Sequence, residues 1–373
     1  METDYINSLI SIPEIPRNCH FWMVRTNDGL FFNEFITNQF IAIGWNSIKQ
    51  STFPLSKSQR ESLECSIKNK YKTSVPGLAI NKCERFCSEL KKGDIAVITG
   101  KEQIAFAIIG DYYEENPEKF TEQLEIEAND KIHEGLYNEI KECPYCKRRK
   151  IDIISIINDR EKINPYLYKA MLLNKHSLSS LNQYSDTILS SCYDIYFWRG
   201  TLSFSFKVQT KNNINAVALS NFICSFASLL KNVDEKNISV KTALHSPGDI
   251  VLQISNWLSN PSTYLWIFVI LMTLFGGKMG TVEFPSIWNV VKYFIERHDN
   301  QTAKQLNEDR LRLENQKLQE EINALKIDND KQKQMNEAAQ SLSQASETLE
   351  IRPISNRVIN IDAIRAEMEN SNR

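Results

Sequence analysis

Two close pairs of cysteines have a spacing that could bind a metal ion. Cys143 and Cys146 form a C-x-x-C pair, and Cys83 and Cys87 lie four residues apart in a predicted helix. Four thiolates around one ion are a common structural zinc site, and His133 is an alternative ligand. Zinc is therefore a candidate cofactor. The pairs are far apart in the chain, and the default interpretation is two reduced core thiols plus an exposed turn.

Three residues near the N-terminus could bind a nucleobase and its phosphate. Trp22 and Arg25 lie on one predicted strand, and Trp45 ends the next one. Aromatic rings stack bases, and a guanidinium group pairs with phosphate. Strand alternation places Trp22 and Arg25 on opposite faces. A pair of core tryptophans with an arginine at a strand end is therefore the competing interpretation.

The densest basic cluster is the run Lys147-Arg148-Arg149-Lys150, which could contact the phosphates of an oligonucleotide. Trp198 and Arg199 offer a second combination of ring and charge. Solvated residues at the start of a strand, and a turn before the strand at Leu202, are the ordinary explanations of these two features.

No pattern for nucleophilic catalysis or phosphate-loop chemistry is found in the sequence. Gly276-Gly277-Lys278 lacks the upstream glycine of a P-loop, and Ser246 does not lie in a G-x-S-x-G motif. The five histidines lie in unrelated contexts. We therefore expect a protein that is not an enzyme.

The charge and cysteine content limit the class of protein. The net charge of −2 gives no overall attraction for nucleic acid, so any anion site must be local. Eight cysteines without regular spacing indicate reduced thiols. The first residues lack the apolar core of a secretory signal. Most of the chain is therefore expected in the cytoplasm.

The run from Ile250 to Gly277 carries no charged residue. Its densest part is apolar on every helical face, which is typical of a helix in lipid or in a large core. Spanning a bilayer takes about 20 apolar residues, and the whole run is long enough for a thin span. A core or oligomer-interface helix and a surface-lying helix remain alternatives. The residues expected in the membrane or pore are Tyr264, Trp266, Phe268, Leu271 and Phe275.

The region after residue 299 changes to Gln, Asn, Glu and Lys with sparse leucines. Leu311, Leu318 and Leu325 fit one heptad position, which favours a coiled coil that sets a homo-oligomer. A single solvated helix or a disordered linker is the alternative. The tail has apolar residues at helical spacing that could form a short docking helix: Val358, Ile361, Ile364 and Met368.

Several N-terminal motifs resemble a known domain. Phe21-Trp22-Met23-Val24-Arg25, Ala42-Ile43-Gly44-Trp45 and Lys92-Gly93-Asp94 resemble the N-terminal domain of Mrr-type restriction and defence proteins. That domain is similar to the PUA/EVE class of small barrels, which bind nucleotides, modified bases or single-stranded nucleic acid. The resemblance covers about a quarter of the chain. The separated Asp…Glu-x-Lys strands of the nuclease half are not found after it.

The C-terminal part has a weaker resemblance, carried by short motifs. Ser246-Pro247-Gly248 leads into the apolar run, which ends Phe275-Gly276-Gly277-Lys278. This order is similar to that of membrane effectors in bacterial anti-phage operons, such as the channel of the Hailong type of system. The resemblance implies a pore controlled by a nucleotide or oligonucleotide, with a nucleotidyltransferase as an operon partner.

The sequence therefore predicts an α+β chain that acts as a ligand-gated pore in the inner membrane for antiviral defence. One alternative is a soluble nucleic-acid-binding module that recognises a modified base or a single strand. Another is a restriction-type specificity subunit whose nuclease lies on a second chain. The expected parts are a PUA-like mixed barrel (1–118), a connecting domain (119–198), an α/β module (199–256), a transmembrane region (257–298), a coiled coil (299–350) and a tail (351–373).

Overall fold

The computed structural model describes most of the first 255 residues and short parts of the rest. The described residues are 12–116, 118–208, 214–229, 238–243, 248–255, 277–279, 282–284, 333–334, 337–352 and 354–356. They form two compact units. Residues 16–192 are the N-terminal unit. Strand β1 (Glu14–Ile15) and the described residues from 193 to 356 are the C-terminal unit.

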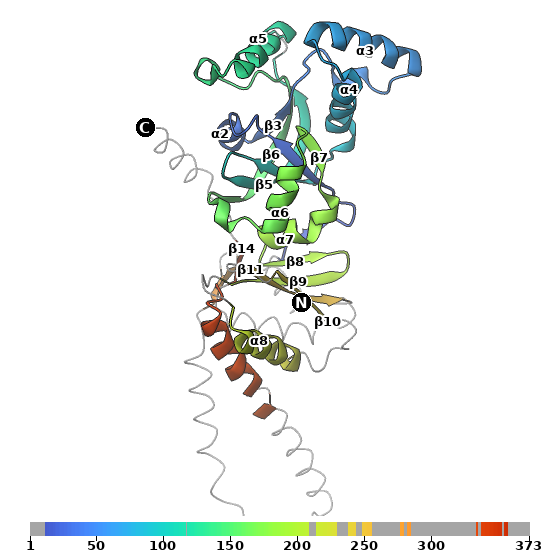
Figure 1. The fold of residues 1–373 in the computed structure, drawn as a ribbon. Coiled ribbons are helices and arrows are strands. Elements are labelled where there is room, and N and C mark those ends of the chain that lie inside the picture. Colours follow the sequence, from blue (N-terminus) through green and yellow to red (C-terminus); the bar gives the residue numbers. More distant parts are fainter. Residues whose placement is uncertain are drawn as a thin grey trace, which may run out of the picture. The chain divides into compact units, whose positions relative to one another are not determined.

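A six-stranded sheet, curved into a half-barrel, forms the centre of the N-terminal unit (Figure 1). The strand order is β3-β6-β5-β4-β2-β7. The β2–β4 pair is parallel and the other neighbouring pairs are antiparallel. The strands are β2 (Phe21–Arg25), β3 (Phe40–Ile43), β4 (Ile95–Thr99), β5 (Ile104–Glu114), β6 (Lys147–Ile157) and β7 (Leu178–Ser180).

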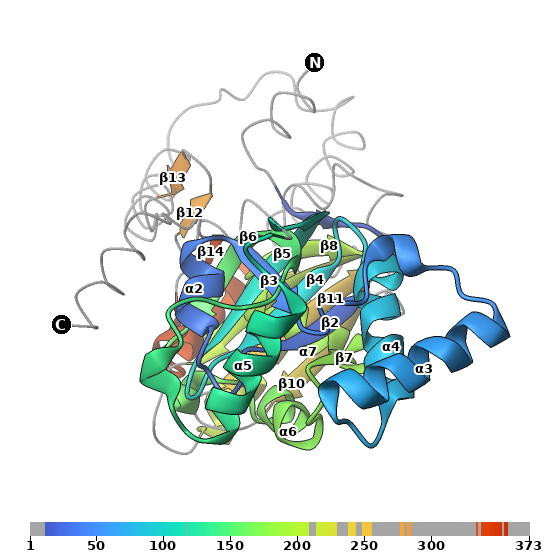
Figure 2. The same cartoon turned by 90° about the horizontal axis from the view of Figure 1, so that it is seen from above.

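Helices and short helical turns pack around this sheet, and Figure 2 shows α3 and α4 side by side at one edge of the unit. The helices are α2 (Phe32–Thr37), α3 (Lys57–Tyr71), α4 (Pro76–Glu84), α5 (Glu122–His133), α6 (Pro165–Leu173) and α7 (Ser185–Cys192). The turns are η1 (Gln50–Thr52), the π-type η2 (Arg85–Glu89), η3 (Tyr137–Glu139), η4 (Arg160–Lys162) and η5 (Asn182–Tyr184).

Two of the apolar clusters among the described residues of the N-terminal unit contact the loop after β3. The larger one fills the half-barrel and contains Phe32, Phe35 and Phe40 beside small residues such as Ala96 and Ala107. A smaller one ties α3 and α4 to the loop after β3, through Ile48, Ile67, Ala79, Ile80 and Cys83. Trp45 packs against both clusters, so it lies where the sheet and the helical hairpin meet.

The C-terminal unit is a five-stranded sheet with helices on one face. Its order is β1-β8-β9-β11-β10, and α8 (Ala216–Leu229) lies across the sheet (Figure 1). Alternate residues of β9 bring Phe204 and Phe206 into edge-to-face contact with Phe222 and Phe226 of α8. The other strands are β8 (Ile195–Trp198), β9 (Thr201–Val208), β10 (Ile238–Ala243) and β11 (Gly248–Ser255).

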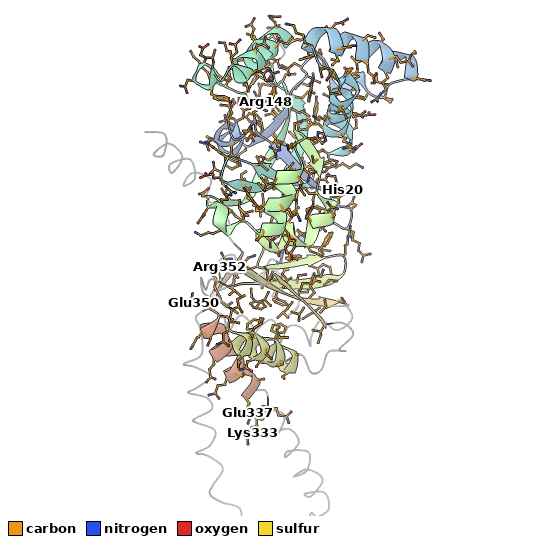
Figure 3. The ribbon with its side chains drawn as sticks, viewed as in Figure 1. His20, Arg148, Lys333, Glu337, Glu350 and Arg352 are labelled. Carbon is orange, nitrogen blue, oxygen red and sulfur yellow. The ribbon has the colours of Figure 1, made fainter. Side chains whose placement is uncertain are left out.

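A second helix, residues 337–348, packs on the same core. Leu342, Ala345 and Leu349 are buried with the phenylalanines of β9 and α8. The chain then pairs with β9 through a bridge from Ile351 to Val208. Arg352, labelled in Figure 3, donates to both carboxylate oxygens of Asp194 at 2.7 and 2.9 Å. Three short strands form a further sheet: β12 (Gly277–Met279), β13 (Val282–Phe284) and β14 (Ile354–Asn356).

The expected fold class is wrong. The described residues form a mixed α/β architecture in which β6 and β7, expected in a connecting domain, belong to the same half-barrel as β2. No helix among the described residues is long and apolar enough to cross a membrane. Gly277 belongs to strand β12, and β13 follows it, within the region expected in the membrane. The pore residues Tyr264, Trp266, Phe268, Leu271 and Phe275 lie outside the described residues.

The expected coiled coil is also wrong for the part that the structure describes, because no coiled coil is found among the described residues. Leu311, Leu318 and Leu325 lie outside them. Ala338, Leu342, Ala345 and Leu349 do have heptad-like spacing. That stripe packs on the core of its own unit, because a short helix-on-sheet stripe has nearly the same period as a coiled-coil seam.

We expect Leu342→Ala to destabilise the C-terminal unit by about 2–5 kcal/mol, because it removes a fully buried leucine. Hydrogen exchange of the β9 and β11 amides measures this loss. Gln344→Ala, at an exposed position of the same helix, is the matched control. Unchanged exchange together with a lower oligomeric mass would instead place Leu342 in a contact between chains.

Candidate functional site

The loop Gly44–Ser47, which we call the Trp45 loop, directly follows β3. Trp45 adopts a left-handed backbone conformation, with φ of 62°, and its side chain is half-buried. For a residue other than glycine, this conformation costs roughly 1–2 kcal/mol. Contacts with the rest of the unit must therefore fix the loop.

A buried carboxylate provides the first of these contacts. Glu125, in the first turn of α5, is 1% exposed. It accepts hydrogen bonds from the backbone N–H groups of both Trp45 and Asn46, the latter at 2.6 Å. The hydroxyl of Tyr71, the last residue of α3, donates to the same carboxylate at 2.9 Å. One side chain of α5 thus joins the loop to α3.

A buried lysine holds the opposite end of the same peptide unit. Lys147 begins β6 and is fully buried, and its Nζ donates to the carbonyl oxygen of Trp45 at 2.5 Å. The N–H of Trp45 therefore binds an acidic side chain, and its carbonyl oxygen binds a basic one. A buried charge is tolerated when it is hydrogen-bonded and an opposite charge is near; each of these side chains binds Trp45, and the charge of Lys147 lowers the pKa of Glu125.

Asn46 fastens the loop to two further segments. Its amide nitrogen donates to the carbonyl oxygens of Pro144 and Phe120 at 2.8 and 3.2 Å. Its amide oxygen accepts from the N–H of Cys146 at 3.0 Å. Gly44 is required on the other side, because a Cβ there would lie 2.6 Å from Glu125 Oε1. The Trp45 loop is therefore held through Gly44, Trp45 and Asn46.

Burial controls the charge state of this network. Desolvation raises the pKa of Glu125, while the N–H groups of Asn46 and Trp45, the charge of Lys147 and the Tyr71 hydroxyl partly lower it. Burial, and then the nearby Glu125 carboxylate, also raise the pKa of Tyr71. Tyr71 therefore keeps its proton and remains the donor.

The outer side of the loop carries groups that could contact a ligand. The ammonium of Lys82 lies 5.3 Å from the centre of the Trp45 ring, a cation–π distance. Burial lowers the pKa of Lys82. Both side chains are only half-buried. A flat ring with a cation beside it is thus open to solvent in part.

Tyr145 packs beside Gly44 and joins two asparagine side chains through its hydroxyl. The Tyr145 ring lies 3.1 Å from where a Cβ of Gly44 would be. Its hydroxyl accepts from the Asn27 amide at 2.9 Å and donates to Asn129 Oδ1 at 3.4 Å. All three side chains are half-buried. Together they offer amide donors and acceptors of the kind that read the edge of a planar polar ligand.

Trp22 and Arg25 are used inside the unit. The indole N–H of Trp22, which is 5% exposed, donates to Asp94 Oδ2 at 3.0 Å. The guanidinium of Arg25 donates to the carbonyl oxygens of Met171 and Asn174 at 2.8 and 3.0 Å, at the end of α6. These contacts agree with the competing interpretation of a core tryptophan and a strand-end arginine.

The basic run is mostly buried. Arg148 (labelled in Figure 3) donates to the carbonyl oxygens of Tyr145 and Cys143, and its guanidinium lies 4.2 Å from the Phe40 ring centre. Arg149 donates to the carbonyl oxygens of Phe86 and Cys87. Lys150 is exposed. The run therefore stabilises the start of β6 and offers little charge to an external phosphate.

Trp198 and Arg199 belong to the C-terminal unit. Arg199 and Gly200, with φ of 53° and 83°, form the two-residue turn between β8 and β9. The Arg199 guanidinium lies 4.2 Å from the centre of the Trp198 ring. The pair thus stabilises a tight hairpin.

The four candidate zinc ligands are buried thiols. Cys83 Sγ lies 3.8 Å from the carbonyl oxygen of Gly44, and Cys146 Sγ lies 4.0 Å from that of Asn46. Burial raises the pKa of each thiol, including Cys87 and Cys143. In the part of the chain that the structure describes, no three Cys, His, Asp or Glu side chains come together as metal ligands. These residues therefore do not fit a zinc site.

Sequence reasoning identified Trp45 but missed its support. Glu125 lies in a stretch with ordinary surface composition, and Lys147 was assigned to a phosphate-binding cluster. The available signal was Gly44, since a glycine at a strand end often marks a close backbone approach. Comparisons of the chain with protein-family models, curated proteins and solved structures gave no match.

We expect the stability of the wild type, relative to Glu125→Gln, to fall as the pH rises from 4.5. Burial raises the pKa of Glu125 in the folded state, so the folded chain binds this proton more tightly than the unfolded chain. The resulting stabilisation is complete below the unfolded pKa and is lost as the pH passes through the folded pKa. The relative slope is at most about 1.4 kcal/mol per pH unit.

Urea unfolding of the wild type and Glu125→Gln at several pH values measures this slope. Glu127→Gln, at an exposed position of α5, is the control and should follow the wild type. A wild type that gains stability over Glu125→Gln with rising pH would show that the hydrogen bonds and Lys147 outweigh burial.

Proposed function

We propose that the N-terminal unit is a binding module that stacks a nucleobase, from a nucleotide or from single-stranded nucleic acid, on Trp45. The proposal rests on the left-handed backbone conformation of Trp45. A strained backbone costs about 1–3 kcal/mol and persists only where its surroundings fix it, which occurs most often at functional sites. Here two buried charges, Glu125 and Lys147, fix a large aromatic residue at a partly open surface.

The neighbouring groups suit the parts of a nucleotide. The indole ring offers a stacking surface, which every base can use. Lys82 can pair with the phosphate attached to a stacked base, since its ammonium lies 5.3 Å from the centre of the Trp45 ring. Asn27, Tyr145 and Asn129 supply hydrogen-bonding groups for a base edge.

The proposal is restricted to ligand binding. The residues predicted to form a pore lie outside the described residues, and the gated pore and its operon partner stay predictions from sequence resemblance. We assign no catalytic role to this site.

Trp45→Ala should weaken binding of a fluorescent oligonucleotide by roughly ten- to a hundredfold, because stacking contributes about 1–3 kcal/mol per base. Anisotropy titrations with short single strands and with mononucleotides measure this loss and identify the source of the base. Trp45→Phe keeps an aromatic ring and should recover part of the affinity. Binding by Trp45→Ala equal to that of the wild type would contradict the proposal.

Lys82→Ala should weaken binding and reduce the slope of log affinity against log salt by about 1, because one phosphate contact is lost. The same titrations at several salt concentrations give this slope. Lys92→Ala removes an exposed lysine that pairs with Asp111, and it should leave both quantities unchanged. An equal loss in both variants would indicate a general charge effect instead of a phosphate contact at Trp45.

A further inference from the structure

A shallow groove runs along α5, on a side of the helix that the Trp45 loop does not use. Its volume is about 250 Å³. One wall is α5 and the other is the segment before β6. Apolar side chains line it: Phe120, Leu124, Ala128, Ile140 and Pro144. We call it the α5 groove.

The α5 groove leaves a large apolar side chain open to solvent. Leu124, in its wall, is 49% exposed. Leu136 and Tyr137, which follow α5 outside the lining of the groove, are 41% and 52% exposed. An exposed leucine in an apolar concave surface is typical of a protein-binding groove.

The rim of the groove is charged but balanced. Lys119 pairs with Glu142 at 2.7 Å, and Lys131 pairs with Glu139 at 3.0 Å. Lys141 and Glu127 complete the lining and add one charge of each sign. The groove therefore favours an apolar segment whose own charges are also balanced.

The C-terminal segment of the chain, residues 357–373, has these properties. If helical, Val358, Ile361, Ile364 and Met368 form one stripe within an arc of about 120°. Its charges are balanced, with arginines at 357, 365 and 373 and acidic residues at 362, 367 and 369. The stripe would be about 15 Å long, and the 12-residue helix α5 is about 18 Å long.

We propose that the α5 groove binds residues 357–373 of the same chain as an amphipathic helix, with the apolar stripe against Leu124. The segment follows β14, where the described chain ends, so it is attached to the protein and needs no separate partner. This proposal does not depend on nucleobase binding at Trp45.

Occupation of the groove would act on the Trp45 loop through two backbone contacts. Phe120 and Pro144 line the groove, and their carbonyl oxygens accept the hydrogen bonds of the Asn46 amide. Glu125, which holds the N–H groups of Trp45 and Asn46, directly follows Leu124 in α5. The docked helix would therefore stabilise the segments to which the loop is fixed.

Photo-crosslinking of the full chain tests this docking. A benzoylphenylalanine at position 124 should crosslink to the peptide 357–373, and one at Leu78, an equally exposed position on α4, should not. Ile361→Asp with Ile364→Asp should lower the yield at least roughly tenfold, because both apolar contacts are lost. Ile359→Asp, on the opposite face of the predicted helix, should leave it unchanged.

Mixing isotopically light and heavy chains distinguishes the possible occupants. Crosslinks within one chain support the proposal, and crosslinks found only between light and heavy chains overturn it. It is also overturned if position 124 reacts with another segment or another protein, or if Ile359→Asp lowers the yield as much as the double variant does. Nucleotide binding is not measured here, so this result is separate from that of the proposed function.

Discussion

The buried carboxylate of Glu125 is the interaction on which the candidate site depends. It accepts two successive backbone N–H groups, of Trp45 and Asn46, and a hydroxyl from α3. Removing a carboxylate from water is costly unless its oxygens are hydrogen-bonded and a positive charge is near. Lys147 provides that charge on the carbonyl side of the same residue. α5, α3 and β6 thus converge on one peptide unit and fix a conformation that tryptophan would not adopt alone.

Several conspicuous charged residues of the N-terminal unit are bound to its own backbone instead of being open to a ligand. Arg25, Arg148 and Arg149 each bind backbone carbonyl oxygens, at a helix end or beside β6. Trp22 is likewise held by Asp94. Lys82 differs, because it is half-buried and its ammonium lies 5.3 Å from the centre of the Trp45 ring. Trp45 and Lys82 thus place an aromatic ring and a cation together at a partly open surface.

Local patterns in the sequence predicted strands better than they predicted how segments combine. The alternation at Phe21–Arg25 and the glycine turn at Gly100 indicate β2 and the β4–β5 hairpin, which depend on neighbouring residues. The addition of β6 and β7 to the same sheet depends on distant pairing, such as Phe40 with Lys150, which a single sequence does not reveal. Similarly, nothing local distinguishes buried Glu125 from half-buried Glu122 or exposed Glu127 in the same helix.

The C-terminal region shows the same limit for helices. The spacing of Leu342, Ala345 and Leu349 predicts an apolar stripe, but the stripe does not specify what covers it. Over three helical turns, a partner helix and the sheet of the same unit can cover such a stripe equally well. The aromatic core of β9 and α8 provides that cover here, so the described segment packs within the chain.

The most direct test of the account is fluorine NMR of protein labelled with 5-fluorotryptophan, with Trp45→Phe used to assign the resonance of Trp45. On titration with a single-stranded oligonucleotide, the account predicts a change in the Trp45 resonance and none in that of buried Trp22. If the oligonucleotide binds while the Trp45 resonance stays unchanged, the base is held elsewhere and the central claim is contradicted.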